Sequence, residues 1–202
     1  MGGRLALVLG VTTEGATELS AGLVRRAGTG VTMLGGAGAS PSTVAGVRDL
    51  LTAAGLRVQT VYDIRPQIWG KLVANAAINP ITALLDAPNG ILLHDEDARD
   101  LARAIALETV AVAEAAHISL PFHDPCEYVS SVASATAQNV SSMLADLRAG
   151  RRTEIEAING AVVTMARRYG LRVPCNEAMV HLVRARERKN ALEFPGNPTT
   201  PA

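Results

Sequence analysis

Short apolar runs separated by turn residues fill the first third of the chain, whereas apolar residues recur at helical spacing in the rest. Three of the runs have the length of β-strands: residues 4–11, 31–34 and 57–61. Ser40-Pro41 predicts a helix start, because serine caps helices and proline suits the first helical position, and Gly55 predicts its end. Three strands and one helix would leave a free sheet edge and an uncovered face, which predicts self-association.

From residue 65 onward the pattern predicts helices. Pro66 suits the first turn of a helix that Pro80 is expected to end or kink, and Asn89-Gly90 predicts a turn. Later helices are predicted to start at Asp95, at Asp124, at a capping box formed by Thr153 and Glu156, and at Pro174. We therefore expect an all-α domain over 65–192, then a disordered tail over 193–202 that is rich in proline and threonine.

Composition agrees with a packed core of helices. The chain has 202 residues, of which 48% are hydrophobic and 3% aromatic, and this balance favours closely packed helices over a β-sandwich. A net charge of zero without a long basic run argues against binding nucleic acid or an anionic membrane. The apolar start, Met1–Val11, is too short to span a membrane and is interpreted as a strand rather than a signal peptide, so we expect a cytoplasmic protein. The two cysteines, Cys126 and Cys175, are then expected to be reduced thiols.

A polar stripe interrupts the most apolar predicted helix. Lys71, Asn75 and Asn79 are spaced so that their side chains line up on one helix face. The chain has 17 arginines and only 2 lysines, and lysine differs from arginine in being able to give up a proton. A solvent-facing stripe would explain the spacing as well. Asparagine is a poor helix former, however, and its presence favours a functional role.

A second polar segment covers residues 141–156. Ser142, Asp146 and Glu154 lie near an apolar frame. A carboxylate at position 154 would also be favoured by the dipole of a helix that starts at Thr153, so a purely structural role stays open. The glycines of 35–38 lack the third glycine of a dinucleotide fingerprint. The histidines show no metal-ligand spacing, and no metal is expected.

Taken together, these segments resemble the ketopantoate reductase (2-dehydropantoate 2-reductase) family. The resemblance covers residues 5–190, and its motifs occur in the order that the family has. The matching motifs are Gly10-Val-Thr-Thr-Glu-Gly-Ala, Gly28-Thr-Gly, Trp69-Gly-Lys with Asn75 and Asn79-Pro, Asn89-Gly90, Ser141-Ser-Met-Leu-Ala-Asp, Thr153-Glu-Ile and Ile158-Asn-Gly.

The resemblance implies a fold and an activity. It implies an α/β remnant of a Rossmann domain over residues 1–64, followed by an all-α substrate domain over 65–192 similar to the C-terminal domain of 6-phosphogluconate dehydrogenase. The implied reaction reduces ketopantoate to pantoate with NADPH, in pantothenate biosynthesis. By position, the resemblance makes Lys71 the general acid and Glu154 the carboxylate that orients the substrate hydroxyl and the cofactor ribose. It makes four residues substrate-binding: Asn75, Asn79, Asn89 and Ser142.

The chain departs from the family pattern at its start. The Gly-x-Gly-x-x-Gly turn that binds the cofactor pyrophosphate in the family has no counterpart here. We therefore expect a truncated or split form that binds NADPH poorly alone and has an N-terminal half or a second copy as its partner. Two other hypotheses remain: a non-catalytic remnant that keeps the helical fold as a binding module, and an unrelated helical interaction protein.

Overall fold

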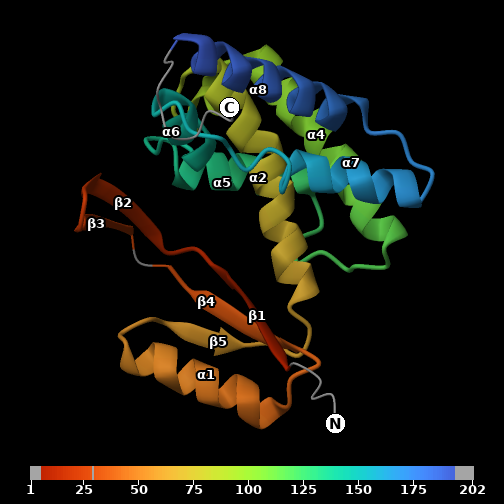
Figure 1. Ribbon diagram of the computed structural model, residues 1–202. Helices are drawn as coiled ribbons and strands as arrows, with labels where there is room; N and C mark the ends of the chain where they lie inside the picture. The colour runs from red at the N-terminus through yellow and green to blue at the C-terminus, as the bar shows by residue number, and fades with distance from the viewer. Residues whose placement is uncertain (1–5, 29, 194–202) are drawn as a thin grey trace. The chain divides into compact units, whose positions relative to one another are not determined.

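The computed structural model describes residues 6–28 and 30–193. Contacts between Cα atoms divide the chain into two compact units, residues 1–68 and 69–202. The first unit carries the sheet and one helix, and the second is helical (Figure 1). The predicted tail falls almost entirely outside the described residues.

A three-stranded sheet organises the first unit. Its strands are β1 (Leu7–Thr12), β4 (Thr32–Ala37) and β5 (Val58–Thr60), in the order β1-β4-β5. β1 pairs antiparallel with β4, and β4 pairs parallel with β5. The crossover between the parallel strands is α1 (Pro41–Ala53), and Ser40 Oγ caps it by accepting a hydrogen bond from the amide of Thr43 at 3.2 Å. The three predicted strands and the predicted helix are thus confirmed, with their ends shifted by a few residues.

The sequence pattern did not predict a hairpin that the structure shows. β2 (Gly15–Ser20) and β3 (Leu23–Gly28) pair with each other as a separate two-stranded ribbon. Threonine, glutamate and two arginines interrupt the apolar residues of these strands, so no apolar run marked them. Their pairing adds no strand to the main sheet.

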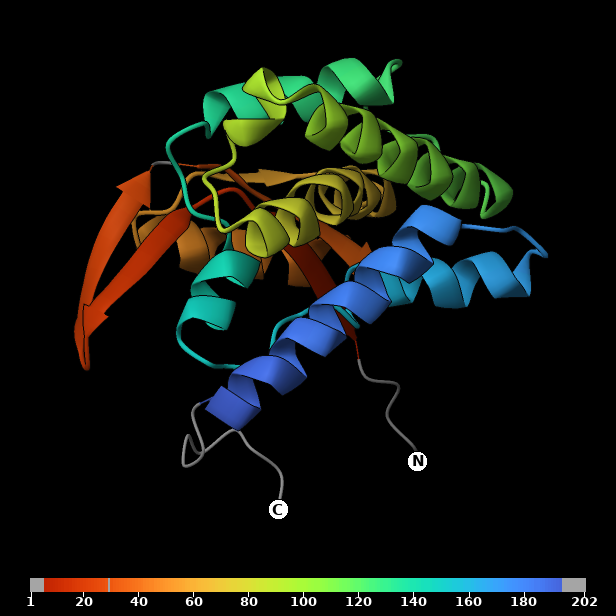
Figure 2. The same cartoon turned by 90° about the horizontal axis from the view of Figure 1, so that it is seen from above.

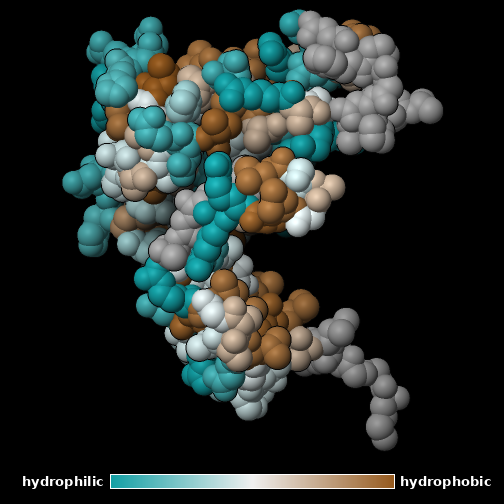
Figure 3. Space-filling model, turned by 90° about the vertical axis from the view of Figure 1, so that its left-hand side faces the viewer, coloured by the Kyte–Doolittle hydropathy of each residue, from teal (hydrophilic) through white to brown (hydrophobic). Residues whose placement is uncertain are grey.

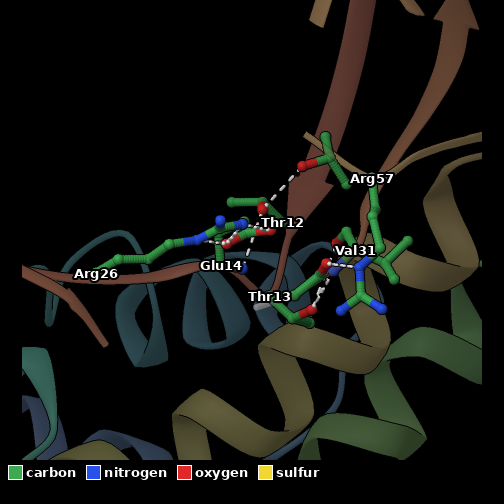
Figure 4. A network of polar contacts seen from close by, with 8 residues as sticks. Thr12, Thr13, Glu14, Arg26, Val31 and Arg57 are labelled. Carbon is green, nitrogen blue, oxygen red and sulfur yellow. Dashed lines mark hydrogen bonds and ion pairs between the residues drawn. The ribbon is translucent and has the colours of Figure 1, made fainter. Parts of the chain in front are cut away.

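Polar contacts tie the base of this hairpin to the sheet (Figure 4). The amide of Val31 donates to Thr13 Oγ1 at 2.9 Å, and the guanidinium of Arg26 binds both oxygens of Glu14 at 2.9 and 3.0 Å. Gly30 is buried here, and a Cβ at its position would lie 2.2 Å from the carbonyl carbon of Thr13. Only glycine therefore permits the two backbone segments to approach so closely.

One long helix, α2 (Arg65–Leu85), is the centre of the second unit (Figures 1 and 2). Eleven of the residues from Gly70 to Ala83 are buried, and four of these are alanines. Their small side chains let the neighbouring helices pack closely. The other helices are α3 (Ile91–His94), α4 (Glu96–Ala115), α5 (Pro125–Ala135), α6 (Ser142–Arg148), α7 (Asn159–Arg168) and α8 (Pro174–Glu193). By length and composition α2 could also cross a membrane, but 61% of its most apolar window is buried, as in the core helix of a folded domain.

Most predicted helix boundaries in this unit are confirmed. Asp95 caps α4 by accepting from the amide of Ala98 at 2.8 Å, and Asp124 caps α5. Asn89-Gly90 forms the predicted turn, and Gly170 follows α7 with a φ of 68°, as expected of a residue just after a helix.

The prediction for one helix start is wrong, and one of the two alternatives expected at Pro80 is excluded. Pro80 was expected to end or kink its helix, and it does not end it, because α2 continues to Leu85. The capping box of Thr153 and Glu156 does not form, and α7 begins only at Asn159. The amide and the hydroxyl of Thr153 instead both donate hydrogen bonds to Glu187 Oε1 of α8, at 2.7 Å each. Glu156 forms an ion pair with Arg184. Partners on a distant helix thus replace the local capping pattern.

Candidate functional site

The predicted polar stripe lies on α2 within the helical unit. Lys71 is exposed, Asn75 is half-buried and Asn79 is 8% exposed, so the stripe runs from the surface into the interior. Because α2 continues past Pro80, all three side chains belong to one uninterrupted helix.

The carboxamide of Asn79 has no hydrogen-bond partner among the described residues, although the residue is buried. Its backbone carbonyl accepts from Thr82 Oγ1 at 3.0 Å, but its side chain makes no such bond. Its polar atoms are not among the buried, unpartnered side-chain atoms of the described residues, which are Asn89 Oδ1 and Asn159 Oδ1. The side chains of Asn75, Ser142 and Glu154 are likewise without hydrogen bonds within the described part of the chain. These groups are therefore free to bind a polar ligand.

The serine pair at the start of α6 has two different roles. Ser141 is buried and caps α6 by accepting from the amide of Leu144 at 3.2 Å. Its hydroxyl also lies 2.9 Å from Thr82 Oγ1, which fixes the start of α6 beside α2. Ser142, the predicted substrate residue, is the exposed first residue of that helix.

Glu154 lies in the segment between α6 and α7, not in a helix. Its side chain is exposed, and its carbonyl accepts from the amide of Ile158 at 3.0 Å. The residue after Ile158, Asn159, donates from Nδ2 to the carbonyl of Ala76 at 3.1 Å. This bond holds the segment that carries Glu154 next to the part of α2 that carries Asn75 and Asn79.

Asn89 is buried and already has one protein partner. Its Nδ2 donates to Thr136 Oγ1, at the end of α5, at 2.9 Å, while its Oδ1 is buried without a partner among the described groups. Its backbone amide donates to the carbonyl of Asn139 at 3.0 Å, three residues before Ser142. The loop after α2 thus lies against the loop that leads into α6.

A buried polar network behind the stripe was not predicted from the sequence. Asn159 and Asn176 are both fully buried and joined by a hydrogen bond of 3.0 Å from Asn159 Nδ2 to Asn176 Oδ1. Glu108 of α4 accepts from the amides of Cys175 and Asn176 at 2.9 Å each, and so caps α8. The available signal was Pro80 itself, since a proline inside a helix leaves one carbonyl in need of a donor.

The weaker sequence signals have structural explanations. A Cβ at Gly35 would lie 2.7 Å from the Cβ of Ile64, so the glycines at the end of β4 permit close packing. Within the described residues no cluster of histidine, cysteine and carboxylate side chains could hold a metal. Both cysteines are free, and burial, the charge of Glu108 and a hydrogen bond with it raise the pKa of the Cys175 thiol.

Comparisons with known proteins identify the relatives of this chain. The family model "Ketopantoate reductase PanE/ApbA C terminal" matches residues 63–187, more than half of the chain. The 2-dehydropantoate 2-reductase of Pyrobaculum aerophilum is 47% identical over 147 residues, which cover 73% of this chain and 52% of that protein. The enzyme of the same name from Archaeoglobus fulgidus is 42% identical over 88% of this chain and 60% of its own length.

Solved structures show the same fold. A PanE/ApbA family ketopantoate reductase from Ralstonia eutropha superposes with a TM-score of 0.82 at 30% identity, covering 91% of this chain and 60% of that one. A D-mandelate dehydrogenase in complex with NADH also reaches 0.82, at 26% identity, over 90% of this chain and 62% of that one.

The matches also define how much of these proteins the chain represents. It spans 52–60% of the length of these two curated relatives. Within that span the match of the family model extends from the end of the first unit to α8 and includes all six predicted site residues. The chain therefore belongs to the ketopantoate reductase PanE/ApbA family, of which it carries the C-terminal domain.

Proposed function

We propose that the chain supplies the substrate-binding and proton-donating side chains of a 2-dehydropantoate 2-reductase, which reduces ketopantoate to pantoate with NADPH in pantothenate biosynthesis. The names of the relatives support this reaction. The proposed location is the cytoplasm, and the proposed partner is an N-terminal nucleotide-binding half or a second copy of the chain.

The observation that carries the proposal is the polar face of α2, where Asn75 and Asn79 lie on the same side as Lys71 and their carboxamides make no hydrogen bond within the described residues. Carboxamides both donate and accept hydrogen bonds, so they suit a substrate that bears a carboxylate, a ketone and a hydroxyl group.

Lys71 is proposed as the general acid. Reduction of the ketone builds negative charge on its oxygen, and a nearby ammonium group stabilises that charge and then delivers the proton. An arginine could stabilise the charge but could hardly give up the proton. This difference accounts for a lysine at this position in a chain that has 17 arginines and only 2 lysines.

Glu154 fits the role of holding hydroxyl groups. Its carboxylate is exposed, accepts no hydrogen bond within the described residues, and lies in a segment fixed beside α2. It can therefore accept hydrogen bonds from a substrate hydroxyl and from a cofactor ribose. The nicotinamide cofactor supplies the hydride when it is bound.

Replacing Lys71 tests the assignment. We expect Lys71→Ala to lower turnover of ketopantoate by about 10²–10⁴-fold, the usual contribution of a general acid, and Lys71→Arg to restore little of it. Turnover would be followed as NADPH oxidation, with the chain alone and with the chain mixed with the N-terminal half of the Archaeoglobus relative.

The chain contains its own control for this test. Lys189 of α8 is its other lysine, and Lys189→Ala should keep the activity of the unmodified chain. Equal activity of Lys71→Ala and Lys189→Ala would rule out Lys71 as the acid. No turnover, either by the chain alone or by the chain mixed with the N-terminal half, would favour the hypothesis of a non-catalytic binding module.

A second candidate substrate is another 2-oxo acid. A D-mandelate dehydrogenase solved with NADH and anilino(oxo)acetate is 26% identical and superposes with a TM-score of 0.80. Assaying ketopantoate beside phenylglyoxylate, with NADPH and with NADH, distinguishes the two. Higher kcat/KM for phenylglyoxylate would replace ketopantoate as the proposed substrate.

A further inference from the structure

The buried helix α2 lacks one of its own backbone hydrogen bonds. Pro80 has no N–H group, so the carbonyl of Ala76, four residues earlier, has no donor from within the helix. Ala76 is fully buried, and water cannot easily take the place of that donor.

Asn159 supplies the missing donor from another helix. As the first residue of α7, it points Nδ2 at the carbonyl of Ala76 at a distance of 3.1 Å. The same nitrogen lies 3.0 Å from Asn176 Oδ1, and Asn176 Nδ2 donates to Glu108 Oε2 at 2.9 Å. The donor is thus held in place by the buried Asn176 of α8 and the half-buried Glu108 of α4.

The carbonyl that Asn159 binds lies within the polar stripe. Ala76 directly follows Asn75 and precedes Asn79 by three residues. Any shift of α7 against α2 at this point would move the turn that presents both asparagines, and with it the side chains proposed to contact substrate.

We propose that Asn159 is a positioning residue: it replaces the backbone amide that Pro80 lacks and thereby fixes the orientation of Asn75, Asn79 and Lys71. Its role in positioning rests on the proposed function, whereas its role in completing α2 does not. Asn159 does not itself touch the substrate.

The hydrogen bond can be tested through thermal stability. Asn159→Ala should lower Tm by about 5 °C, because it leaves the Ala76 carbonyl without a donor. In a Pro80→Ala background the amide of residue 80 can bind that carbonyl, so the same replacement should lower Tm by clearly less. An equal decrease of Tm in both backgrounds would overturn the proposal that Asn159 replaces the backbone amide that Pro80 lacks.

Asn190 provides a matched control. It is 6% exposed and donates from Nδ2 to a helix carbonyl, that of Leu147, at 2.8 Å. Asn190→Ala should therefore also lower Tm, but by the same amount in the unmodified chain and in the Pro80→Ala background, because its carbonyl is unrelated to the proline.

Measuring kcat distinguishes an effect of Asn159 on the position of the site residues from an effect on stability alone. At a temperature at which every variant is folded, Asn159→Ala should lower kcat for ketopantoate by about 10²-fold, a usual effect of misplaced reacting groups, while Asn190→Ala retains it. Pro80→Ala should restore part of the lost kcat. Equal kcat values for the two alanine variants would overturn the positioning role. If the unmodified chain shows no turnover even when mixed with the N-terminal half, the proposed function is refuted, and the Tm comparison still decides the hydrogen bond.

Discussion

At the scale of single residues, two buried asparagines in this domain differ in their hydrogen bonds. Asn79 is 8% exposed and its carboxamide has no partner among the described residues, whereas Asn159 is fully buried and donates to two acceptors. The first is available to a ligand, and the second connects two helices through its Nδ2, while its own Oδ1 is buried without a partner among the described groups.

This difference predicts unequal effects of the same substitution on stability. Asn79→Leu should change the free energy of unfolding little, because it removes no hydrogen bond within the described residues, and should abolish binding of pantoate. Asn159→Leu should lower the free energy of unfolding by about 1–3 kcal/mol, because it leaves Ala76 without a donor.

Urea unfolding of both variants measures the change in the free energy of unfolding. Titration of pantoate into the folded proteins measures the change in binding. If Asn79→Leu destabilises the chain as much as Asn159→Leu does, the Asn79 carboxamide has an internal role and is not reserved for a ligand.

At the scale of elements, the cap of helix α5 makes the stability of the protein depend on pH. Asp124 Oδ1 accepts from the amides of Glu127 and Cys126 at 3.0 and 2.7 Å, and these bonds lower the pKa of its carboxyl group below the ordinary 3.8. A lowered pKa means that the unfolded chain binds the proton more readily than the folded chain. The stabilisation is therefore complete above the ordinary value and is lost as the pH falls toward the lowered one.

An asparagine at this position would cap the helix without titrating. Asp124→Asn should therefore reduce the loss of stability on acidification, and Asp124→Ala should destabilise α5 even at neutral pH. Urea midpoints measured as a function of pH check this. An acid response of Asp124→Asn identical to that of the unmodified chain would contradict it.

The elements also show how far the sequence could predict the structure. Helix starts marked by a local cap, such as Asp95 and Asp124, were predicted correctly because cap and helix are neighbours in the chain. The start of α7 was predicted wrongly because Thr153 binds Glu187, 34 residues away. The stripe on α2 followed from helical spacing, but the hydrogen bond that completes α2 joins residues 83 apart and left no local pattern.

At the scale of the whole molecule, the sheet unit retains exposed apolar surface, and apolar surface is visible in the lower part of Figure 3. The α1 side of the sheet includes Gly36, beside Val44, so the opposite side carries Leu7 and Leu9, paired with Ala37 and Gly35. Leu7 is 55% exposed and Leu9 38%. Exposed apolar side chains on a sheet face favour association.

We therefore expect the chain to self-associate at high concentration and Leu9→Lys to weaken that association, as measured by sedimentation velocity. Leu50→Lys is the control, because Leu50 is 72% exposed on α1 and should not matter. A chain that sediments as a monomer at every concentration, or equal behaviour of the two variants, would contradict this role of the sheet face.

The bond between Asn159 and Ala76 also sets an order of assembly during synthesis. During translation α2 is synthesised long before residue 159. The carbonyl of Ala76 in the middle turn of the nascent helix therefore has no hydrogen-bond donor at that stage. Only when α7 emerges and docks does that turn gain its last donor. The helix made early is thus completed late, by the last third of the chain.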